Sequence, residues 1–163
     1  MDMKDDFRVL ELLEEDGRAS VKDIASMLGL REKEVDENIK DLKRKGVIKG
    51  FKAVVDWRKA SKKKVMASIQ VKVVPQPKAG FAKICTDLSK DKRIVDAFVA
   101  TGEYDLILFV EADTLEDISD FVTERLATKK EVRGTNTHII LSQFKRDGKL
   151  FTDRAGGRLP LSP

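Results

Sequence analysis

The hydrophobic positions in the first 46 residues recur at helical spacing in three short runs. The first spans residues 5–15, the second follows Ser20 and ends at Gly29, and the third ends at Gly46. Ser20 stands three residues before an aspartate, a variant of the capping box that marks a helix start. Three short helices, with a glycine in the turn between the second and the third, predict a helix-turn-helix, although any small three-helix bundle shares this periodicity.

Beyond Gly46 the pattern changes. Residues 47–56 are rich in β-branched side chains and are predicted to be extended, and residues 65–74 alternate apolar and polar side chains as a half-buried strand does. The later elements are a helix at 78–89, strands at 94–101 and 105–112 around a Gly-Glu-Tyr loop, a helix at 114–126 and a strand at 132–144. This βαββαβ order predicts an α+β domain of ferredoxin-like type.

In such a domain both helices lie on one face of an antiparallel sheet. The other face is left bare, and several of its predicted residues are β-branched. A large uncovered apolar surface usually marks an interface. We therefore expect the sheet to pair with a second copy of the chain.

The 163 residues are enough for two small domains. We predict a helix-turn-helix domain at 1–56, a basic linker at 57–64, the βαββαβ domain at 65–145 and a C-terminal tail at 146–163. Charge is uneven: the first 48 residues carry 10 Lys and Arg against 13 Asp and Glu, whereas the next 16 carry 7 against 1. The basic stretch thus falls between the two predicted domains.

Several classes of protein are excluded by composition. No apolar stretch approaches the roughly 18 residues of a membrane span, and the acidic start lacks the basic and apolar regions of a signal peptide. We expect a cytoplasmic protein without membrane contact. The one cysteine, Cys85, and the one histidine, His138, cannot build a four-ligand zinc site, so no metal and no cofactor are expected.

Four segments, in order and at consistent spacings, carry a family resemblance. They are Asp-Gly-Arg at 16–18, the run from Gly46 to Asp56, Thr-Gly-Glu-Tyr-Asp at 101–105 and the start of the last strand at 132–137. With the two-domain layout, they make residues 6–145 resemble the Lrp/AsnC (feast/famine) transcriptional regulators. The resemblance implies a winged helix-turn-helix that binds double-stranded DNA.

The resemblance also implies a sensing domain. It implies a homodimer formed through that domain, assembly to a tetramer or octamer, and a small effector, an amino acid or related metabolite, bound at an interface near the hairpin loop. A polar pair beside a glycine on a loop is well placed to bind an ammonium or carboxylate, although a plain turn has the same sequence. The effector-site candidates are Thr101, Gly102, Tyr104, Asp105, Thr135 and Thr137.

The third helix departs from the family pattern. The family usually starts it with serine and places arginine on its DNA-facing side, whereas this chain has Arg31 and Asn38 there, among several acids. Arg31 can bond guanine bidentately and Asn38 adenine, but each carboxylate near the DNA backbone opposes binding. The other DNA-binding candidates are Lys33, Lys40, Lys43, Arg44 and Lys49. Alternatively, the cations at the helix end are solvated and stabilise the helix dipole.

Two further functions stay open at this point. The acidic third helix would suit a metabolite-sensing assembly partner whose DNA binding is weak or lost. Some proteins of this two-domain layout are instead sirohaem decarboxylases. One histidine, one tyrosine and no nucleophile, metal or phosphate-loop motif argue against an enzyme here.

Overall fold

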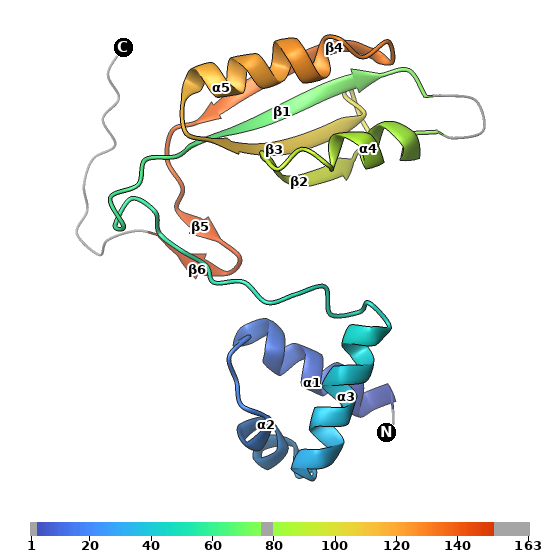
Figure 1. Cartoon of the computed structure of the whole chain (residues 1–163), viewed down its shortest axis with the longest axis vertical. Coiled ribbons are helices and arrows are strands. Elements are labelled where there is room, and N and C mark those ends of the chain that lie inside the picture. The colour runs from blue at the N-terminus through green and yellow to red at the C-terminus, as the bar shows by residue number, and fades with distance from the viewer. Residues whose placement is uncertain (1–2, 76–79, 152–163) are drawn as a thin grey trace. The chain divides into compact units, whose positions relative to one another are not determined.

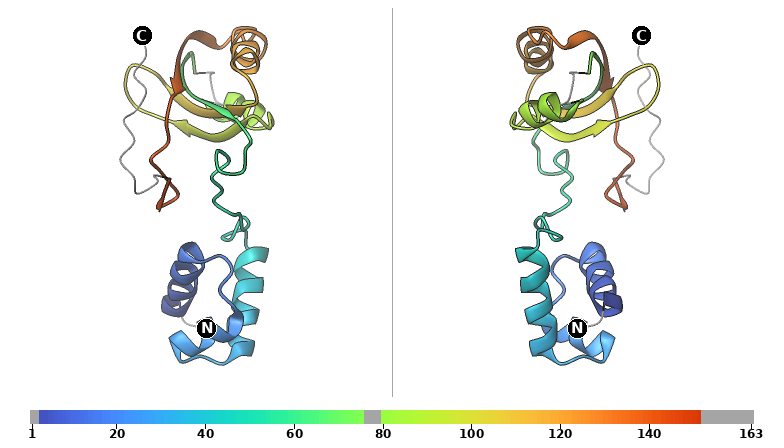
Figure 2. Two further views of the ribbon diagram at one scale, coloured as in Figure 1. Left: turned by 90° about the vertical axis from the view of Figure 1, so that its left-hand side faces the viewer. Right: turned by 90° about the vertical axis from the view of Figure 1, so that its right-hand side faces the viewer.

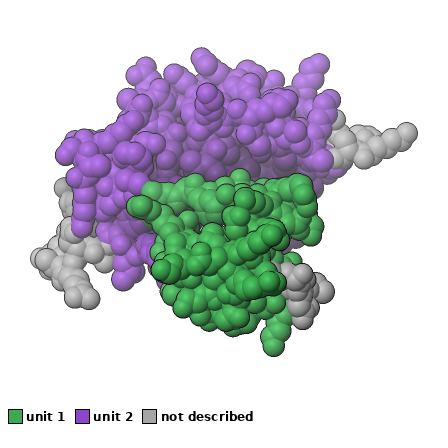
Figure 3. Space-filling view, turned by 60° about the horizontal axis from the view of Figure 1, so that its bottom comes forward, with its two compact units in different colours: residues 1–54 green, residues 55–163 purple. Residues whose placement is uncertain are grey.

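The computed structural model of the chain describes residues 3–75 and 80–151. It divides into two compact units, residues 1–54 and residues 55–163 (Figure 3). Each unit has its own hydrophobic cluster.

Unit 1 is built from three helices, as the sequence predicts: α1 (Met3–Glu15), α2 (Val21–Leu28) and α3 (Glu32–Arg44) (Figure 1). The predicted start of α2 is confirmed. The Ser20 hydroxyl accepts a hydrogen bond from the Asp23 amide at 3.1 Å and donates one to the Asp23 carboxylate at 2.6 Å. Gly29 ends α2 in the left-handed conformation, with a φ of 69°, which glycine adopts without steric cost.

The core of unit 1 comes from all three helices. Val9 of α1, Ile24 of α2 and Val35 of α3 are fully buried together, and Ile48 packs against them from the segment after α3. The rest of the segment at 47–56 forms no paired strand among the described residues. Its β-branched pattern therefore did not predict a paired strand, and, unlike Ile48, its large apolar residues Val47, Phe51 and Val54 are exposed.

Unit 2 contains an antiparallel four-stranded sheet in the order β2-β3-β1-β4. The strands are β1 (Val65–Val73), β2 (Ile94–Val99), β3 (Leu106–Ala112) and β4 (Val132–Ile140). This is the predicted ferredoxin-like arrangement. β4 ends earlier than the predicted strand at 132–144.

One face of the sheet is covered by helices (Figure 2). They are α4 (Ala82–Leu88), α5 (Leu115–Asp120) and the π-helix η1 (Phe121–Leu126). The sequence predicts one continuous helix at 114–126, but its second half is wound as a π-helix. The first residues of the helix predicted at 78–89, 78 and 79, lie outside the described residues.

The core of unit 2 lies between the sheet and these helices. Alternate residues of β1 and β3, such as Ile69 and Leu108, meet Ile118 and Phe121 from the helical layer, and all four are at most 2% exposed. Burying a side chain of this size removes apolar surface from water and stabilises the fold by about 1.5–3 kcal/mol. The alternation in the strands therefore decides which face the helices cover.

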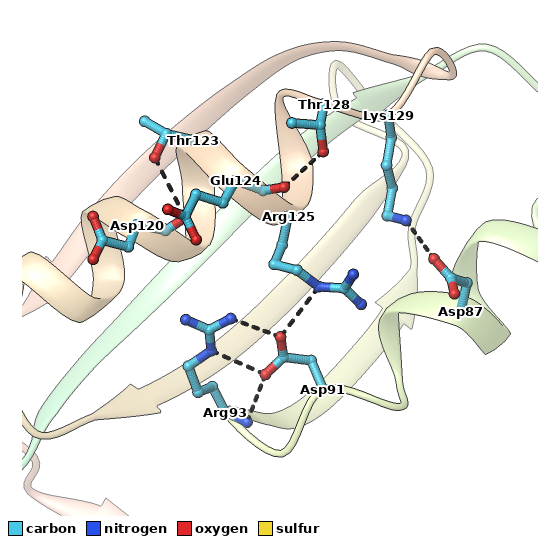
Figure 4. A network of polar contacts seen from close by, with 9 residues as sticks. All are labelled: Asp87, Asp91, Arg93, Asp120, Thr123, Glu124, Arg125, Thr128 and Lys129. Carbon is cyan, nitrogen blue, oxygen red and sulfur yellow. Dashed lines mark hydrogen bonds and ion pairs between the residues drawn. The ribbon is translucent and has the colours of Figure 1, made fainter.

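Charged side chains connect the helical layer at its edge (Figure 4). Asp91, in the turn before β2, binds Arg93 and also lies 3.4 Å from Arg125 of η1. Nearby, Lys129 pairs with Asp87 of α4. The Asp91–Arg125 pair thus connects the turn after α4 to η1. The Asp87–Lys129 pair connects the end of α4 to the residues that follow η1.

The segment predicted as a basic linker, 57–64, begins with a hydrogen-bonded turn in unit 2. The amide of Lys62 donates to the carbonyl of Trp57 at 3.0 Å, and the turn runs into β1. At the other end a short hairpin, β5 (Lys145–Arg146) and β6 (Lys149–Leu150), turns through two residues of positive φ, Asp147 and Gly148. The rest of the predicted tail, 152–163, lies outside the described residues.

Candidate DNA-binding helix and effector pocket

The exposed face of α3 alternates basic and acidic side chains at helical spacing. Lys33 and Glu37 lie 3.9 Å apart, and Lys40 lies 2.6 Å from Asp36, each pair joining successive turns of the helix. The ion pair with Asp36 raises the pKa of Lys40. Two of the predicted DNA-binding lysines, Lys33 and Lys40, therefore already face a carboxylate.

Cations at each end of α3 are also paired with an acid of the same helix. Arg31 lies 2.5 Å from Glu34, and this hydrogen bond raises the pKa of Arg31 and lowers that of Glu34. At the C-terminal end, Asp41 pairs with both Lys45 and Arg44, and the hydrogen bond from Lys45 is the main cause of its lowered pKa. A phosphate that approaches these cations competes with a carboxylate on the same helix.

Asn38 does not lie on this exposed face. The residue is 8% exposed, and its side-chain amide donates a hydrogen bond to Asp6 of α1. The prediction that Asn38 faces base edges therefore does not fit the structure. The error comes from counting positions along the helix without knowing which side packs against α1.

Lys43 and Lys49 extend the basic surface past the end of α3. The ammonium of Lys43 lies 4.9 Å from the centre of the Phe51 ring, a cation–π contact that leaves the charge facing solvent. Lys49 is exposed and follows the turn at Gly46. Lys43 and Lys49 thus place two cations at the C-terminal end of α3 and just beyond it.

A polar hollow lies beside the loop between β2 and β3. Thr101 and Tyr104 of the predicted effector site line it, together with Glu103 of the same loop. The opposite wall comes from outward-facing side chains of β1, β3 and β4 that are not among the predicted site residues: Gln70, Ile107 and Asn136. The strand alternation alone places Gln70 on the face without helices, which is the signal that could have found it.

Two hydrogen bonds hold this wall and its loop. The Asn136 amide lies 3.4 Å from the Gln70 carbonyl oxygen, so the two carboxamides stand side by side across β1 and β4. Lys72 donates to the backbone carbonyl of Glu103 at 2.5 Å and fixes the loop against β1. The hollow is therefore a surface of hydroxyl, amide and carboxylate groups.

Asp105 is held by the backbone of β1. Its carboxylate accepts a hydrogen bond from the Val73 amide at 2.9 Å, and its own amide donates to Val71 at 3.0 Å. Gly102 has a φ of 128°, a conformation that side-chain-bearing residues rarely adopt. Both residues shape the loop, and neither lines the hollow.

Thr135 and Thr137 lie on the other face of the sheet. They are paired with Val71 and Ile69, which point toward the helices, whereas Asn136 between them is paired with Gln70. The structure thus brings Thr101 and Tyr104 together but separates Thr135 and Thr137 from them. A shift of one residue along a strand changes the face, so Asn136 occupies the position predicted for its neighbours.

Neither a membrane span nor a metal cluster is found in the parts of the chain that the structure describes. No helix there has the length and apolar character needed to cross a bilayer. Within the same residues, no three His, Cys, Asp or Glu side chains are grouped so that they could hold a metal ion.

Comparison with known protein families matches both halves of the chain. Residues 6–49 match the winged helix-turn-helix DNA-binding family, and residues 66–150 match the Lrp/AsnC ligand binding domain. Among curated proteins, the chain is 34% identical over 157 residues to the uncharacterized HTH-type transcriptional regulator YugG of Bacillus subtilis, covering 95% of each. It is 32% identical over 146 residues to the HTH-type transcriptional regulator FL11 of Pyrococcus horikoshii, covering 89% of this chain and 93% of that one.

Solved structures share the fold. The leucine response regulatory protein LrpA of Mycobacterium tuberculosis has a TM-score of 0.73 at 23% identity, covering 91% of this chain and 98% of that one. The regulator NMB0573 of Neisseria meningitidis, in complex with L-Met, has a TM-score of 0.67 at 22% identity, covering 90% and 94%. The named relatives are regulators and not enzymes, so a decarboxylase role has no support. With both domains and the relatives in agreement, this chain belongs to the Lrp/AsnC family of DNA-binding transcriptional regulators, with a helix-turn-helix and a ligand-binding domain.

Proposed function

We propose that this regulator responds to an amino acid, or a closely related metabolite, that binds in the polar hollow beside the β2–β3 loop. In this proposal residues 1–56 bind DNA, 57–64 connect the two parts, 65–145 bind the effector and oligomerise, and 146–163 form a tail. The observation that carries the proposal is the meeting of Thr101 and Tyr104 with the side-by-side amides of Gln70 and Asn136.

The lining of the hollow suits a zwitterion. Glu103 offers a carboxylate to an ammonium group, and the hydroxyls and amide groups offer both donors and acceptors to a carboxylate. The structure of NMB0573 with L-Met supports an amino acid as the effector class, since that regulator shares this fold.

We propose that the chain acts as a homodimer through the sheet face without helices, with larger assemblies built from dimers. Phe98 of β2 and Phe109 of β3 meet edge to face on that surface, with ring centres 6.4 Å apart, and Phe98 is 53% exposed. Ile107 of β3, which is paired with Phe98, continues this apolar area. An exposed apolar surface of this kind favours association.

In our proposal α3 enters the major groove of DNA, with Arg31 near base edges and Lys43, Arg44 and Lys49 near phosphates. The ion pairs of α3 reduce its attraction to phosphate, so one unit 1 alone binds weakly. A dimer overcomes this weakness because its second helix-turn-helix binds at a high effective concentration.

Mobility shift of genomic DNA fragments by the full chain, across a salt series and with an amino-acid panel, tests the proposal. We expect retarded fragments at low salt and an affinity that changes with one effector. Replacing Lys43 by Ala should weaken binding to every sequence and lower the salt slope by about 1, whereas Arg31→Ala should also relax the preference at one base position.

The same experiment distinguishes a second candidate, a metabolite-sensing partner whose DNA binding has been lost. The ion-paired face of α3 favours it. If the oligomer binds an amino acid but retards no fragment even at low salt, the sensing-partner function replaces the regulator that we propose.

A further inference from the structure

A second cavity lies in unit 2, away from the polar hollow beside the β2–β3 loop. It encloses about 110 Å³ between the junction segment, residues 55–58, and the ends of β1, β3 and β4. Trp57, Lys64, Met66, Glu111, Ile140 and Arg146 line it, and none of them lines the hollow beside the β2–β3 loop. The cavity is therefore a separate candidate site.

Two cations face one carboxylate in this cavity. Arg146 donates to the Glu111 carboxylate at 2.6 Å, and the Lys64 ammonium lies 3.5 Å from its other oxygen. The Glu111 side chain is 12% exposed, whereas the side chains of Arg146 and Lys64 are 24% and 30% exposed, so both cations can be reached from solvent. Lys62 also lines the cavity, which leaves its wall with more positive than negative charge and attracts an anion.

The other walls are apolar. Met66 and Ile140 face each other across the pairing of β1 and β4, and the Trp57 ring lies beside them in the lining, with the Lys64 ammonium 5.4 Å from its centre. Trp57 remains 40% exposed, so its ring has surface that a ligand could cover. A ligand with one anionic end and one apolar end would use both kinds of wall.

The volume limits the size of that ligand. A cavity of roughly 150 Å³ accepts a benzene molecule, so 110 Å³ with an open mouth suits a single ring or a short chain. A nucleotide, with a base, a sugar and phosphates, is too large.

We propose that this cavity is a second effector site, which takes a small monocarboxylate with an aromatic or short aliphatic tail. The carboxylate pairs with Arg146 and Lys64 in competition with Glu111, and the tail packs on Trp57, Met66 and Ile140. Binding in this cavity does not depend on whether the polar hollow beside the β2–β3 loop binds an amino acid.

A ligand in this cavity would also act on the junction segment. Arg58 donates to the backbone carbonyl of Phe151 at 2.5 Å and binds Asp56, so the junction segment is tied to the end of the described chain. Residues 55–58 continue directly from the DNA-binding unit. Occupancy would fix this segment and thereby alter DNA affinity, a consequence that rests on the proposed function.

The chain contains one tryptophan, Trp57, which makes the test specific to this cavity. The full-length protein is titrated with sodium benzoate while tryptophan fluorescence and heat of binding are followed, with neutral benzamide as the matched ligand. We expect saturable binding of benzoate and of hexanoate, and none of benzamide. Arg146→Gln should weaken benzoate binding at least about tenfold because a charge-assisted hydrogen bond is lost.

Lys63→Gln serves as the control, since it removes an exposed charge from the same basic segment without touching the cavity. If Arg146→Gln lacks native circular dichroism, Lys64→Gln with calorimetry decides instead. Absence of saturable binding by both acids, or equal benzoate affinity in the cavity variant and Lys63→Gln, overturns the proposal. Benzoate binding without any DNA binding would refute the regulator function and leave this site intact.

Discussion

The carboxylate of Asp91 accepts three hydrogen bonds from Arg93. The backbone amide and Nε of Arg93 donate to one oxygen at 3.1 and 3.0 Å, and Nη2 donates to the other at 2.8 Å. The same guanidinium lies 5.0 Å from the centre of the buried Phe121 ring. Figure 4 shows the hydrogen bonds between Asp91 and Arg93, and with the Phe121 contact this single arginine joins the turn before β2 to the π-helix that covers the sheet.

We predict that the contact between Asp91 and Arg93 makes the free energy of unfolding decrease as the pH falls. The hydrogen bonds from Arg93 lower the pKa of Asp91 from 3.8 to about 2. A lowered folded-state pKa stabilises the fold above the unfolded value, and that contribution disappears as the pH falls toward about 2. Asp91→Asn should therefore cost about 1–2 kcal/mol in free energy of unfolding near neutral pH and almost nothing near pH 2.

Urea unfolding of both proteins across this pH range measures the difference. Asp120→Asn, at an exposed aspartate that ends α5, provides the matched control, and its effect should be small at every pH. A difference between Asp91→Asn and the parent that does not shrink on acidification would show that Arg93 does not stabilise the ionised carboxylate.

We predict that removing one acid from α3 strengthens DNA binding. Glu37→Gln deletes a carboxylate on the exposed face and releases Lys33, 3.9 Å away, for a phosphate. Non-specific affinity should rise severalfold at low salt, with a steeper dependence on salt concentration. Fluorescence anisotropy with a labelled duplex measures both quantities.

Glu11→Gln on α1 has the same change of net charge and serves as the comparison. If the two variants bind DNA equally well, total charge accounts for the gain and Glu37 has no special position. A loss of affinity in Glu37→Gln would instead mean that this carboxylate contacts a base or orients Lys33.

Asp105 and Gln70 allow the shape of the loop to be separated from binding in the hollow. Asp105→Ala leaves the Val73 amide without its acceptor, so the fold should lose about 1–3 kcal/mol. Gln70→Ala removes a lining side chain without breaking a backbone contact, and should weaken effector binding with little effect on thermal stability. Calorimetry with amino acids and thermal unfolding together distinguish the two effects.

The reverse outcome would reassign the residues. If Asp105→Ala remained as stable as the parent but bound its effector poorly, the carboxylate would be a ligand contact and not a brace for the loop. If Gln70→Ala bound every amino acid like the parent, the hollow would not be the effector site.

The contrast between Asn38 and Ser20 shows what the sequence could and could not predict. Ser20 acts within one helical turn, so the chain alone specifies its hydrogen bonds to Asp23. The burial of Asn38 depends on α1, which is distant in sequence. The order of helices and strands along the chain was predictable from periodicity. The face of the sheet on which Thr135 and Thr137 lie was not, because it depends on the pairing of β4 with β1.

The hairpin at the end of the chain had a readable signal. Asp147 and Gly148 both have positive φ, and an Asp-Gly pair between strands favours such a turn. The cavity at the junction segment had no such sequence signal, because its lining residues, such as Trp57 and Arg146, are distant in sequence and meet only in the folded sheet.

The last prediction concerns assembly through the open sheet face. Phe98 is 53% exposed and packs edge to face on Phe109, so it belongs to the apolar area that we expect a second copy to cover. Phe98→Glu places a charge in that interface, where its desolvation is not compensated, and should convert the dimer to a monomer at micromolar concentration.

Leu115→Glu is the matched control, because Leu115 is 59% exposed but lies at the start of α5, in the layer on the opposite face. Light scattering should report a dimer or larger assembly for the parent and for Leu115→Glu, and a monomer for Phe98→Glu. Since α3 binds weakly on its own in our proposal, Phe98→Glu should also lose DNA retardation although unit 1 is unchanged. A Phe98→Glu protein that stays dimeric would place the interface elsewhere, and a monomeric variant that still retards DNA would show that one helix-turn-helix is sufficient.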